Sequence, residues 1–317
     1  MKVLITGGAG FIGSHLSALF TEKKHQGYIV DNLLTSTKKN LETISHQKNL
    51  TFIKADLCEP VSLKPLLKKN FDIIYHLASP ASPVQYERFP LAALKVNSFG
   101  TYYLLELLKK SKKTAFVYAS TSEVYGDPLV HPQTESYWGN VNSFGPRSCY
   151  DEAKRFGEAL CYTYLHKEKL NIRVARIFNT YGPNMEKEDG RVISNFIVQA
   201  LTNSPLTIFG DGSQTRSFCY VDDLIQALYL MGQKPIKGQI VNLGNPQEIS
   251  VLEIAKKIKT LTNSHSSLVF KPLPQDDPRR RKPDITKAKK LLEWEPHHTL
   301  NKGLESTIAY FKKRFGL

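Results

Sequence analysis

The chain opens with Met1-Lys-Val-Leu-Ile-Thr-Gly-Gly-Ala-Gly-Phe-Ile-Gly13, an apolar run that leads directly into Gly7, Gly10 and Gly13. Residues 3–6 have the composition of a buried strand, and a helical pattern begins after Gly10. Glycines at such a strand-to-helix turn allow a pyrophosphate to approach the backbone, where the free amides of the helix N-terminus can bind it. This stretch therefore predicts a nucleotide-binding turn at the first strand of a parallel sheet.

The first 180 residues repeat this alternation of strands and helices, which is typical of a doubly wound parallel sheet. The predicted strands there cover residues 3–6, 28–31, 51–54, 73–77, 115–120 and 173–177, and the longest helices 91–110 and 150–166. After residue 182 the predicted elements are shorter, with helices over 192–201, 221–231, 251–261 and 300–315 and a strand over 240–243. We predict an α/β fold, with a doubly wound parallel-sheet Rossmann domain over 1–180 and a smaller α/β substrate-binding domain over 181–317. A segment near 217–245 is expected to return to the first domain.

The composition is that of an ordinary globular protein, since 41% of the 317 residues are hydrophobic and 23% are charged. Lys and Arg number 43 against 29 Asp and Glu, a net charge of +14, but no nucleic-acid-binding motif accompanies the scattered basic residues. The four cysteines are too far apart in sequence to indicate a zinc site or a disulfide framework. No apolar run reaches the ~18 residues of a membrane span. We therefore expect no nucleic-acid, membrane or metal partner, and a cytoplasmic location.

Asp31, the acid that ends the second predicted strand, lies 18 residues after Gly13. A carboxylate at this position accepts hydrogen bonds from the adenosine ribose of a dinucleotide and repels a 2′-phosphate, so NAD is favoured over NADP. The alternative is a glycine turn beside a surface acid. The other residues expected to contact the cofactor are Phe11, Ile12, Asn32, Asp56, Leu57, Leu77, Ala78, Ser79, Ser120, Tyr150, Lys154 and Thr180.

Tyr150 and Lys154 are four residues apart in a predicted helix and therefore share one of its faces. A protonated lysine beside a phenol stabilises the phenolate, so it lowers the phenol pKa from its ordinary value of ~10 toward the range of a general base. In isolation such a pair is usually exposed and without a function. Here it follows the half of the chain that has the pattern of a dinucleotide-binding domain. Residues 120–123 (STSE) end the preceding predicted strand, where their hydroxyls could bind a substrate hydroxyl. Together these features predict Tyr150 as the general base of an enzyme.

Seven longer stretches carry a resemblance to a known family. They are 76–83 (HLASPASP), 120–128 (STSEVYGDP), 145–152 (GPRSCYDE), 176–183 (RIFNTYGP), 190–192 (GRV), 214–218 (QTRSF) and 281–285 (RKPDI). The chain resembles the extended short-chain dehydrogenase/reductases that act on nucleotide sugars, and among them most closely the UDP-glucuronate decarboxylases. This resemblance covers nearly the whole chain.

The resemblance implies an NAD-dependent decarboxylation of UDP-glucuronate. Tyr150 would take the proton of the sugar 4-hydroxyl while NAD takes the C4 hydride, CO₂ would leave from the 4-keto sugar, and the returning hydride would give UDP-xylose. Related dehydratases carry an Asp as catalytic acid after Thr121, whereas this chain has Ser122. Glu123 would lie near the substrate carboxylate and disfavour its charge. The catalytic residues implied are Thr121, Ser122, Glu123, Tyr150, Lys154 and Arg216.

The resemblance also implies where the substrate binds. Asn179, Arg216 and Arg281 would meet the diphosphate, and Tyr86 would reach the sugar carboxylate. Arg216 has two implied roles, because it could lie either beside the reacting carbons or against phosphate. The further substrate-binding residues implied are Asn97, Val192, Asn195, Leu206 and Phe209, the last four around the uracil. A homodimer formed through the helices predicted over 91–110 and 150–166 is also implied.

Other functions remain open from the sequence. A relative that releases the 4-ketopentose with NADH, a nucleotide-sugar 4-epimerase or a 4,6-dehydratase would use the same Tyr/Lys pair, and a non-catalytic NAD-binding module would keep only the fold. Some residues also have structural alternatives. Glu123 could be a salt-bridged or helix-capping acid, Arg216 and Arg281 surface cations, and Tyr86 a packed aromatic. Trp138 and its neighbours are expected to pack the loop before the Tyr150 helix.

Overall fold

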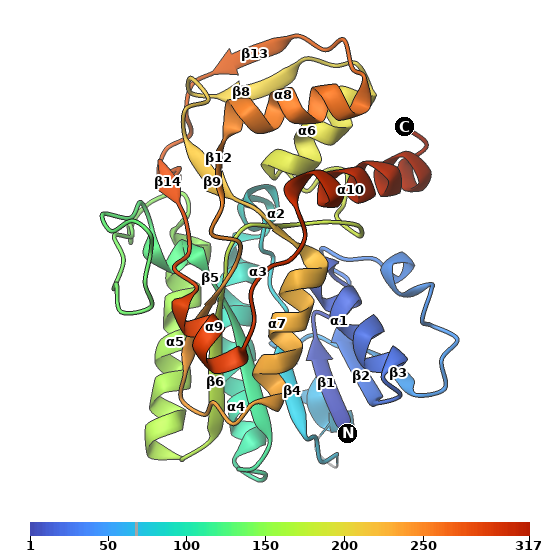
Figure 1. The fold of residues 1–317 in the computed structure, drawn as a ribbon. Helices are drawn as coiled ribbons and strands as arrows, with labels where there is room; N and C mark the ends of the chain where they lie inside the picture. The colour runs from blue at the N-terminus through green and yellow to red at the C-terminus, as the bar shows by residue number, and fades with distance from the viewer. Residues whose placement is uncertain (67–68) are drawn as a thin grey trace.

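Seven strands form the central sheet of the computed structural model, which describes residues 1–66 and 69–317 (Figure 1). The strands are β1 (Lys2–Thr6), β2 (Gln26–Asp31), β3 (Leu50–Lys54), β4 (Ile73–His76), β5 (Ala115–Thr121), β6 (Asn171–Ile177) and β11 (Ile240–Leu243). Their order is β11-β6-β5-β4-β1-β2-β3, and every neighbouring pair is parallel. The strands predicted from the sequence are confirmed, with boundaries that differ by at most two residues.

Helices cover both faces of this sheet. They include α1 (Phe11–Glu22), α4 (Thr101–Leu108), α5 (Ser148–Lys167) and α7 (Val221–Gln233). Val3 and Ile5 of β1 belong to an apolar core shared with α1 and α7, whereas Leu4 between them belongs to a second core shared with α4 and α5. A strand buried on both faces is apolar at every position, which explains the continuous apolar run in β1. The doubly wound parallel arrangement predicted from the sequence is confirmed.

The helix predicted over residues 91–110 is interrupted, which corrects the sequence-based boundary. The structure has α3 over Pro90–Lys95, a π-helical turn η3 over Val96–Gly100, and only then α4. Within the turn the Asn97 side chain donates a hydrogen bond to the carbonyl oxygen of Ala93 at 2.9 Å. The side chain thus competes with the backbone for an acceptor of the helix, which is a known cause of local irregularity.

A second lobe lies beyond the carboxyl ends of the sheet strands, at the top of Figure 1. Its elements are α6 (Val192–Leu201), β8 (Leu206–Phe209), β9 (Thr215–Ser217), β12 (Glu248–Ser250), α8 (Val251–Thr262), β13 (Leu268–Lys271), β14 (Arg280–Arg281) and α10 (Leu300–Phe315). Between β9 and β12 the chain returns to the sheet as α7 and β11. The limits of the two domains, 1–180 and 181–317, remain predictions.

The shorter elements are η1 (Lys38–Leu41), η2 (Pro60–Leu66), α2 (Pro83–Arg88), η4 (Ser122–Tyr125), β7 (Thr180–Tyr181), β10 (Cys219–Tyr220) and α9 (Thr286–Leu292).

The strand order reverses at β1, which pairs with β2 on one side and with β4 on the other. In open parallel sheets the connections leave in opposite directions at such a point, and a crevice opens at the carboxyl ends of the strands. In this protein the second lobe faces that crevice. The fold therefore positions a binding site between the sheet and the second lobe.

Gly13 packs against the backbone of the opening turn more tightly than Gly10 does. A Cβ on Gly13 would overlap the carbonyl oxygen of Gly7 and lie 2.7 Å from the Cα of Gly8, whereas a Cβ on Gly10 would meet only the Gly7 oxygen, at 3.3 Å. Because backbone atoms cannot swing aside, we expect Gly13→Ala to lower the free energy of unfolding by about 1–3 kcal/mol. Gly10→Ala, the matched control, should change it by less than about 1 kcal/mol. Thermal unfolding measures both, and equal losses in the two variants would contradict this packing argument.

Candidate active site

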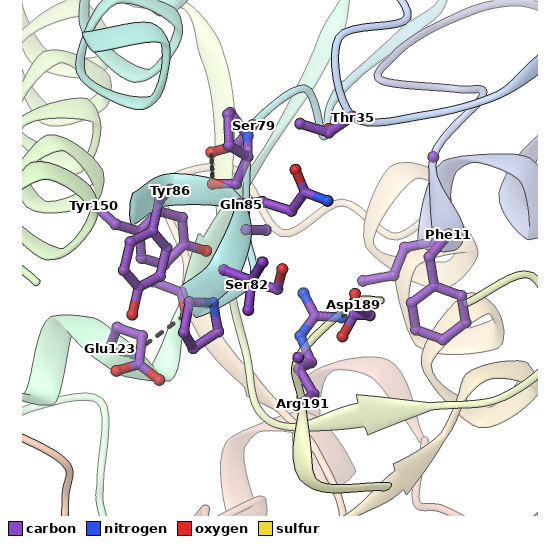
Figure 2. Close-up of a pocket in the computed structure, with 18 of the residues that line it drawn as sticks. Phe11, Thr35, Ser79, Ser82, Gln85, Tyr86, Glu123, Tyr150, Asp189 and Arg191 are labelled. Carbon is purple, nitrogen blue, oxygen red and sulfur yellow. Dashed lines mark hydrogen bonds and ion pairs between the residues drawn. The ribbon is translucent and has the colours of Figure 1, made fainter. Parts of the chain in front are cut away.

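A cavity of about 1010 Å³ lies in the crevice between the sheet and the second lobe. All the residues that the sequence analysis assigns to cofactor, catalysis or substrate line this cavity, except Asn97 and Leu206. Figure 2 shows part of its wall, with Tyr86, Tyr150 and Glu123 on one side and Phe11 across from them. The glycine turn and the Tyr/Lys pair therefore open into one continuous space.

Asn97 and Leu206 are buried behind the cavity wall. Asn97 has no exposed surface, and its amide donates to Ser79 Oγ at 2.9 Å, so it supports a residue that does line the cavity. Leu206 is also fully buried and belongs to the apolar core. Neither side chain lines the cavity in this structure, and the substrate contacts implied for them remain predictions.

Asp31 anchors the end of the cavity that begins at the glycine turn. Its carboxylate accepts hydrogen bonds from the backbone amide of Ala9 at 3.0 Å, from the amide of Leu33 at 2.9 Å and from Ser36 Oγ at 2.8 Å. The acid thus ties the glycine turn to the loop after β2. At the centre of the turn, Gly7 has a φ of +69°, a left-handed conformation that glycine adopts without strain. These contacts fit a ribose and pyrophosphate site, with the Asp31 carboxylate at its edge.

Tyr150 and Lys154 both line the cavity from α5. The Lys154 ammonium lies 5.8 Å from the centre of the Tyr150 ring and donates a hydrogen bond to the carbonyl oxygen of Ala119 at 2.7 Å. Burial lowers the pKa of Lys154 to about 7, although the Glu158 carboxylate raises it in part. The spacing in the sequence therefore brought the two side chains to one face, as predicted.

The pKa of Tyr150 differs from the sequence-based expectation. Burial raises the pKa of this phenol above its ordinary value, and a hydrogen bond with Thr121 opposes the shift only in part. The prediction that Lys154 lowers the phenol pKa is wrong for the chain's own groups, because the loss of hydration dominates and the ammonium is bonded to the backbone. The protein by itself therefore holds Tyr150 as a neutral phenol.

Tyr86 stacks on Tyr150 in the wall of the cavity (Figure 2). The ring centroids are 5.1 Å apart and the ring planes differ by 10°. Tyr86 is 1% exposed, and its hydroxyl has no hydrogen-bond partner among the described residues. A buried hydroxyl without a partner costs free energy, which a polar ligand in the cavity can recover. Tyr86 is therefore a packed aromatic that also offers a hydroxyl to a ligand.

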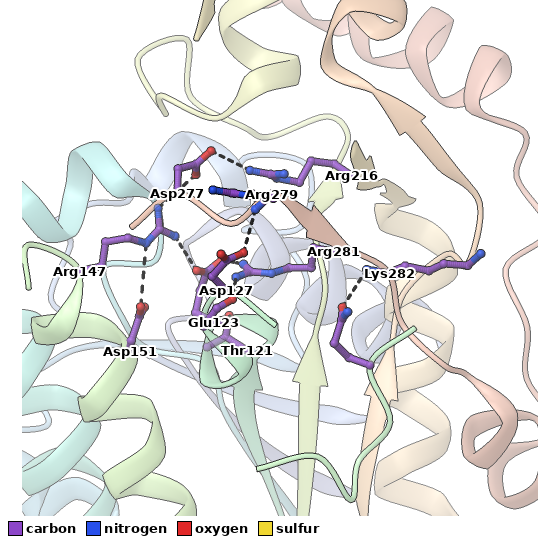
Figure 3. Close-up of polar contacts among 12 residues, drawn as sticks. Thr121, Glu123, Asp127, Arg147, Asp151, Arg216, Asp277, Arg279, Arg281 and Lys282 are labelled. Carbon is purple, nitrogen blue, oxygen red and sulfur yellow. Dashed lines mark hydrogen bonds and ion pairs between the residues drawn. The ribbon is translucent and has the colours of Figure 1, made fainter. Parts of the chain in front are cut away.

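Glu123 lies between two guanidinium groups (Figure 3). Its Oε2 is 2.5 Å from Nη2 of Arg147, and its Oε1 is ion-paired with Nη1 of Arg281. Burial alone would raise the pKa of this carboxyl, but Arg281 and Arg147 together outweigh the effect and lower it well below its usual range. Glu123 is thus a salt-bridged acid that lines the cavity with its charge compensated.

The two arginines predicted to bind phosphate are buried, so the alternative of surface cations is wrong. Arg216 is 7% exposed and Arg281 is 2% exposed. Nη2 of Arg216 lies 2.8 Å from Asp277 Oδ2, and Nη2 of Arg281 donates to the carbonyl oxygen of Gly126 at 2.8 Å. Nη1 and Nη2 of Arg281 are therefore held by Glu123 and Gly126, and its Nε has no partner among the described residues. Arg216 instead pairs with a carboxylate on the loop before β14.

Several polar residues of the cavity were missed by the sequence analysis. They are Ser82, Gln85, Arg147, Asp189, Arg191, Gln214 and Asp277. Arg147 and Arg191 lie inside stretches that carry the family resemblance, at 145–152 and 190–192, so their charge within these motifs was an available signal. Asp277 lies in a loop rich in Pro and Asp, where nothing in the local sequence indicates an ion pair with a distant arginine.

The loop before α5 also differs from its expected packing. Trp138 is 88% exposed, so the expectation that its side chain packs the loop is wrong. Tyr137, one of the neighbours expected to pack the loop, does so, since its ring stacks on Tyr125 with centroids 6.0 Å apart. The loop is held through its backbone, because Nη1 of Arg155 donates to the Trp138 carbonyl oxygen at 2.7 Å.

Among residues 1–66 and 69–317, no group of three or more His, Cys, Asp or Glu side chains is placed to hold a metal ion. No described helix is long and apolar enough to cross a membrane.

Comparison with known proteins identifies the family. The family model described as GDP-mannose 4,6 dehydratase matches residues 4–307. UDP-glucuronic acid decarboxylase 1 of Danio rerio is 50% identical over 98% of this chain and 73% of its own length. UDP-glucose 4-epimerase from Thermotoga maritima has a TM-score of 0.92 at 31% identity, covering 99% of this chain and 100% of that one. UDP-glucuronic acid 4-epimerase from Bacillus cereus, solved with UDP-glucuronic acid and NAD, has a TM-score of 0.89 at 30% identity over 99% of this chain and 100% of that one.

The two solved epimerases share the fold of this chain, and the decarboxylase from Danio rerio is more similar to it in sequence than either of them. The identity falls from 50% for the relative from Danio rerio to about 30% for the two epimerases. The resemblance carried by the seven stretches is therefore confirmed, and the chain belongs to the UDP-glucuronic acid decarboxylase family of the extended short-chain dehydrogenase/reductases.

Proposed function

We propose that this protein converts UDP-glucuronate to UDP-xylose and CO₂ through a UDP-4-keto intermediate, with an NAD that is reduced and reoxidised within each turnover. The main support for this proposal comes from the residues around Glu123. The residue before it is Ser122, and the Glu123 carboxylate itself is bound to Arg147 and Arg281. Loss of a C6 hydroxyl needs a free acid at this place, whereas loss of CO₂ does not.

The residues around the glycine turn fit NAD. Gly7, Gly10 and Gly13 give a backbone that a pyrophosphate can approach, and Asp31 lies where an adenosine ribose would bind. When bound, NAD supplies the acceptor for a hydride from C4 and, in its oxidised form, a positive charge on the nicotinamide ring. Ser79, which Asn97 orients, is among the residues that would hold it.

Tyr150 acts on the sugar 4-hydroxyl in this proposal. The phenolate of Tyr150 takes the hydroxyl proton as the C4 hydrogen leaves with its electron pair, and Thr121 donates a hydrogen bond to the same oxygen. The C6 carboxylate is then β to a ketone, so the C5–C6 bond breaks and its electron pair enters the C4 enolate. A proton from water would add to C5, the hydride would return to C4, and Tyr150 would give its proton back to the C4 oxygen, which completes UDP-xylose. Lys154 orients the base, and Ser122 donates a hydrogen bond to the substrate.

The anionic substrate fits the basic residues of the cavity. UDP-glucuronate carries a diphosphate and a carboxylate, and Arg191 and Arg216 offer guanidinium groups that can bind either. We assign the diphosphate to Arg216 and Asn179, with the uracil framed by Val192, Asn195 and Phe209. Arg281 pairs with Glu123 through Nη1, and its Nε, which has no partner among the described residues, could meet phosphate as well.

A homodimer is also part of the proposal. The helices α3, α4 and α5 and the turn η3 between α3 and α4 expose large apolar side chains, and exposed apolar patches mark interfaces. These side chains are Leu91, Leu94, Phe99, Tyr102, Phe156 and Tyr162. The cytoplasmic location expected from the sequence remains a prediction.

The products of the purified protein test the proposed reaction. With UDP-glucuronate we expect CO₂ and UDP-xylose in equal amounts and no lasting NADH absorbance, because the hydride returns to C4. UDP-glucose should be a poor substrate, since it has no carboxylate to lose. Mass spectrometry of the nucleotide sugars measures the outcome. UDP-galacturonate without CO₂, or a 4-keto-6-deoxy sugar from UDP-glucose, would show an epimerase or a dehydratase. A 4-ketopentose with stoichiometric NADH would show a decarboxylase that releases its intermediate.

Tyr150→Phe tests the assignment of the base. The substitution removes one hydroxyl and keeps the ring that stacks on Tyr86, so we expect the fold and NAD binding to be retained. Turnover should fall by roughly 10²-fold or more, the scale of a lost general base. Tyr162→Phe, which removes a hydroxyl from an exposed tyrosine on the same helix, is the matched control. Near-normal turnover of Tyr150→Phe in a steady-state assay would exclude Tyr150 as the base.

A further inference from the structure

Arg147 lies immediately before α5 and contacts three carboxylates (Figure 3). Its Nη2 is 2.5 Å from Glu123 Oε2, its Nη1 is 3.5 Å from Asp277 Oδ1 and its Nε is 3.9 Å from Asp151 Oδ2. Only 13% of its side-chain surface is exposed. A guanidinium this buried is stable only when it is paired, so these contacts fix its place in the protein.

The three carboxylates do not hold Arg147 equally. Asp151 is the farthest of the three, and its Oδ1 has no hydrogen-bond partner among the described residues. Burial and the neighbouring Glu123 carboxylate raise the pKa of Asp151, which favours its neutral form. Glu123 and Asp277 are therefore the partners that bind Arg147, and the shorter contact is with Glu123.

We propose that Arg147 is a positioning residue of the reaction. It holds one oxygen of Glu123 while Arg281 holds the other. Through Asp277 it also links Glu123 to Arg216. The inference rests on the proposed function, because it concerns how Glu123 is presented to the sugar carboxylate. With both oxygens held, the carboxylate cannot rotate, and its charge is compensated before an anionic substrate arrives. Removal of Arg147 would free one oxygen and leave part of the charge unpaired.

The groups around Glu123 decide what that removal does to its protonation. Arg147 lies just before α5, and Tyr150 and Asp151 lie on that helix. The other groups are Tyr86 on α2, Arg216 on β9 and Arg281 on β14. Of these, Arg147 and Arg281 are the cations in contact with the carboxylate. Without Arg147, one of the two compensating cations is lost and burial favours the protonated form of Glu123. Glu123 should then bind a proton at a higher pH than in the wild type.

Kinetics of Arg147→Gln separate positioning from direct substrate binding. We expect kcat to fall by about 10-fold or more, KM for UDP-glucuronate to change by less than about 3-fold, and the acidic limb of the kcat profile to move to higher pH. Arg147→Lys should recover part of kcat, because a cation near Glu123 is restored. Arg280→Gln is the control, since Arg280 is exposed and its side chain makes no ion pair among the described residues. A rise in KM with kcat unchanged, or a loss of kcat that is equal at every pH, would overturn the proposal.

A second measurement does not depend on activity. In protein labelled with ¹³C at the glutamate carboxyl carbon, the Glu123 signal is assigned by its absence from Glu123→Gln. In the wild type this signal should stay that of an ionised carboxylate down to the lowest pH at which the protein is folded. In Arg147→Gln it should titrate at a higher pH. The same titration in both proteins would overturn the proposal, whatever the wild type does with UDP-glucuronate. An inactive wild type with the expected titrations would instead overturn only the proposed function.

Discussion

The Glu123 carboxylate, held between the guanidinium groups of Arg147 and Arg281, is the contact on which the catalytic side of the cavity depends. It joins the end of β5 to the start of α5 and to β14, which is 158 residues farther along the chain. A buried ion pair of this kind costs about 3–5 kcal/mol when one partner is lost, because the remaining charge is left without hydration or a counterion. The same ion pair therefore stabilises the junction of sheet and second lobe and sets the charge that a substrate meets.

Local patterns in the sequence predict most of the fold and the two ends of the site. A strand buried on both faces must be apolar throughout, as Val3, Leu4 and Ile5 are, and the glycine turn must lack side chains where backbone segments touch. The four-residue spacing of Tyr150 and Lys154 likewise follows from the period of a helix. These features could be predicted because each depends on neighbours within a few residues.

The features that the sequence did not show depend on contacts between distant segments. Arg147 and Asp277 pair across 130 positions of the chain, and no local period indicates which arginine meets which acid. The π-helical turn at Asn97 depends on a side chain that hydrogen-bonds both the preceding helical turn and Ser79 in another loop. The burial of Arg281 is of the same kind, since the arginine lies in a basic run whose other members are exposed or half-buried.

Tyr150 lines the catalytic side of the cavity, and its protonation depends on the charges around it. Burial keeps its phenol neutral, and Lys154, whose ammonium is bonded to the Ala119 carbonyl oxygen, does not reverse this. In the proposed mechanism a base is needed when C4 is oxidised, which is when a bound NAD would be in its oxidised and positively charged form. A positive charge near the phenol would stabilise the phenolate, and reduction of the nicotinamide would remove that charge. The pKa of Tyr150 would then rise again, so the protonated phenol would be favoured, and in the proposed mechanism its proton would pass to the C4 alkoxide, which is the stronger base. In the proposed mechanism, the burial that keeps the phenolate of Tyr150 scarce would thus make its protonation follow the redox state of a bound NAD.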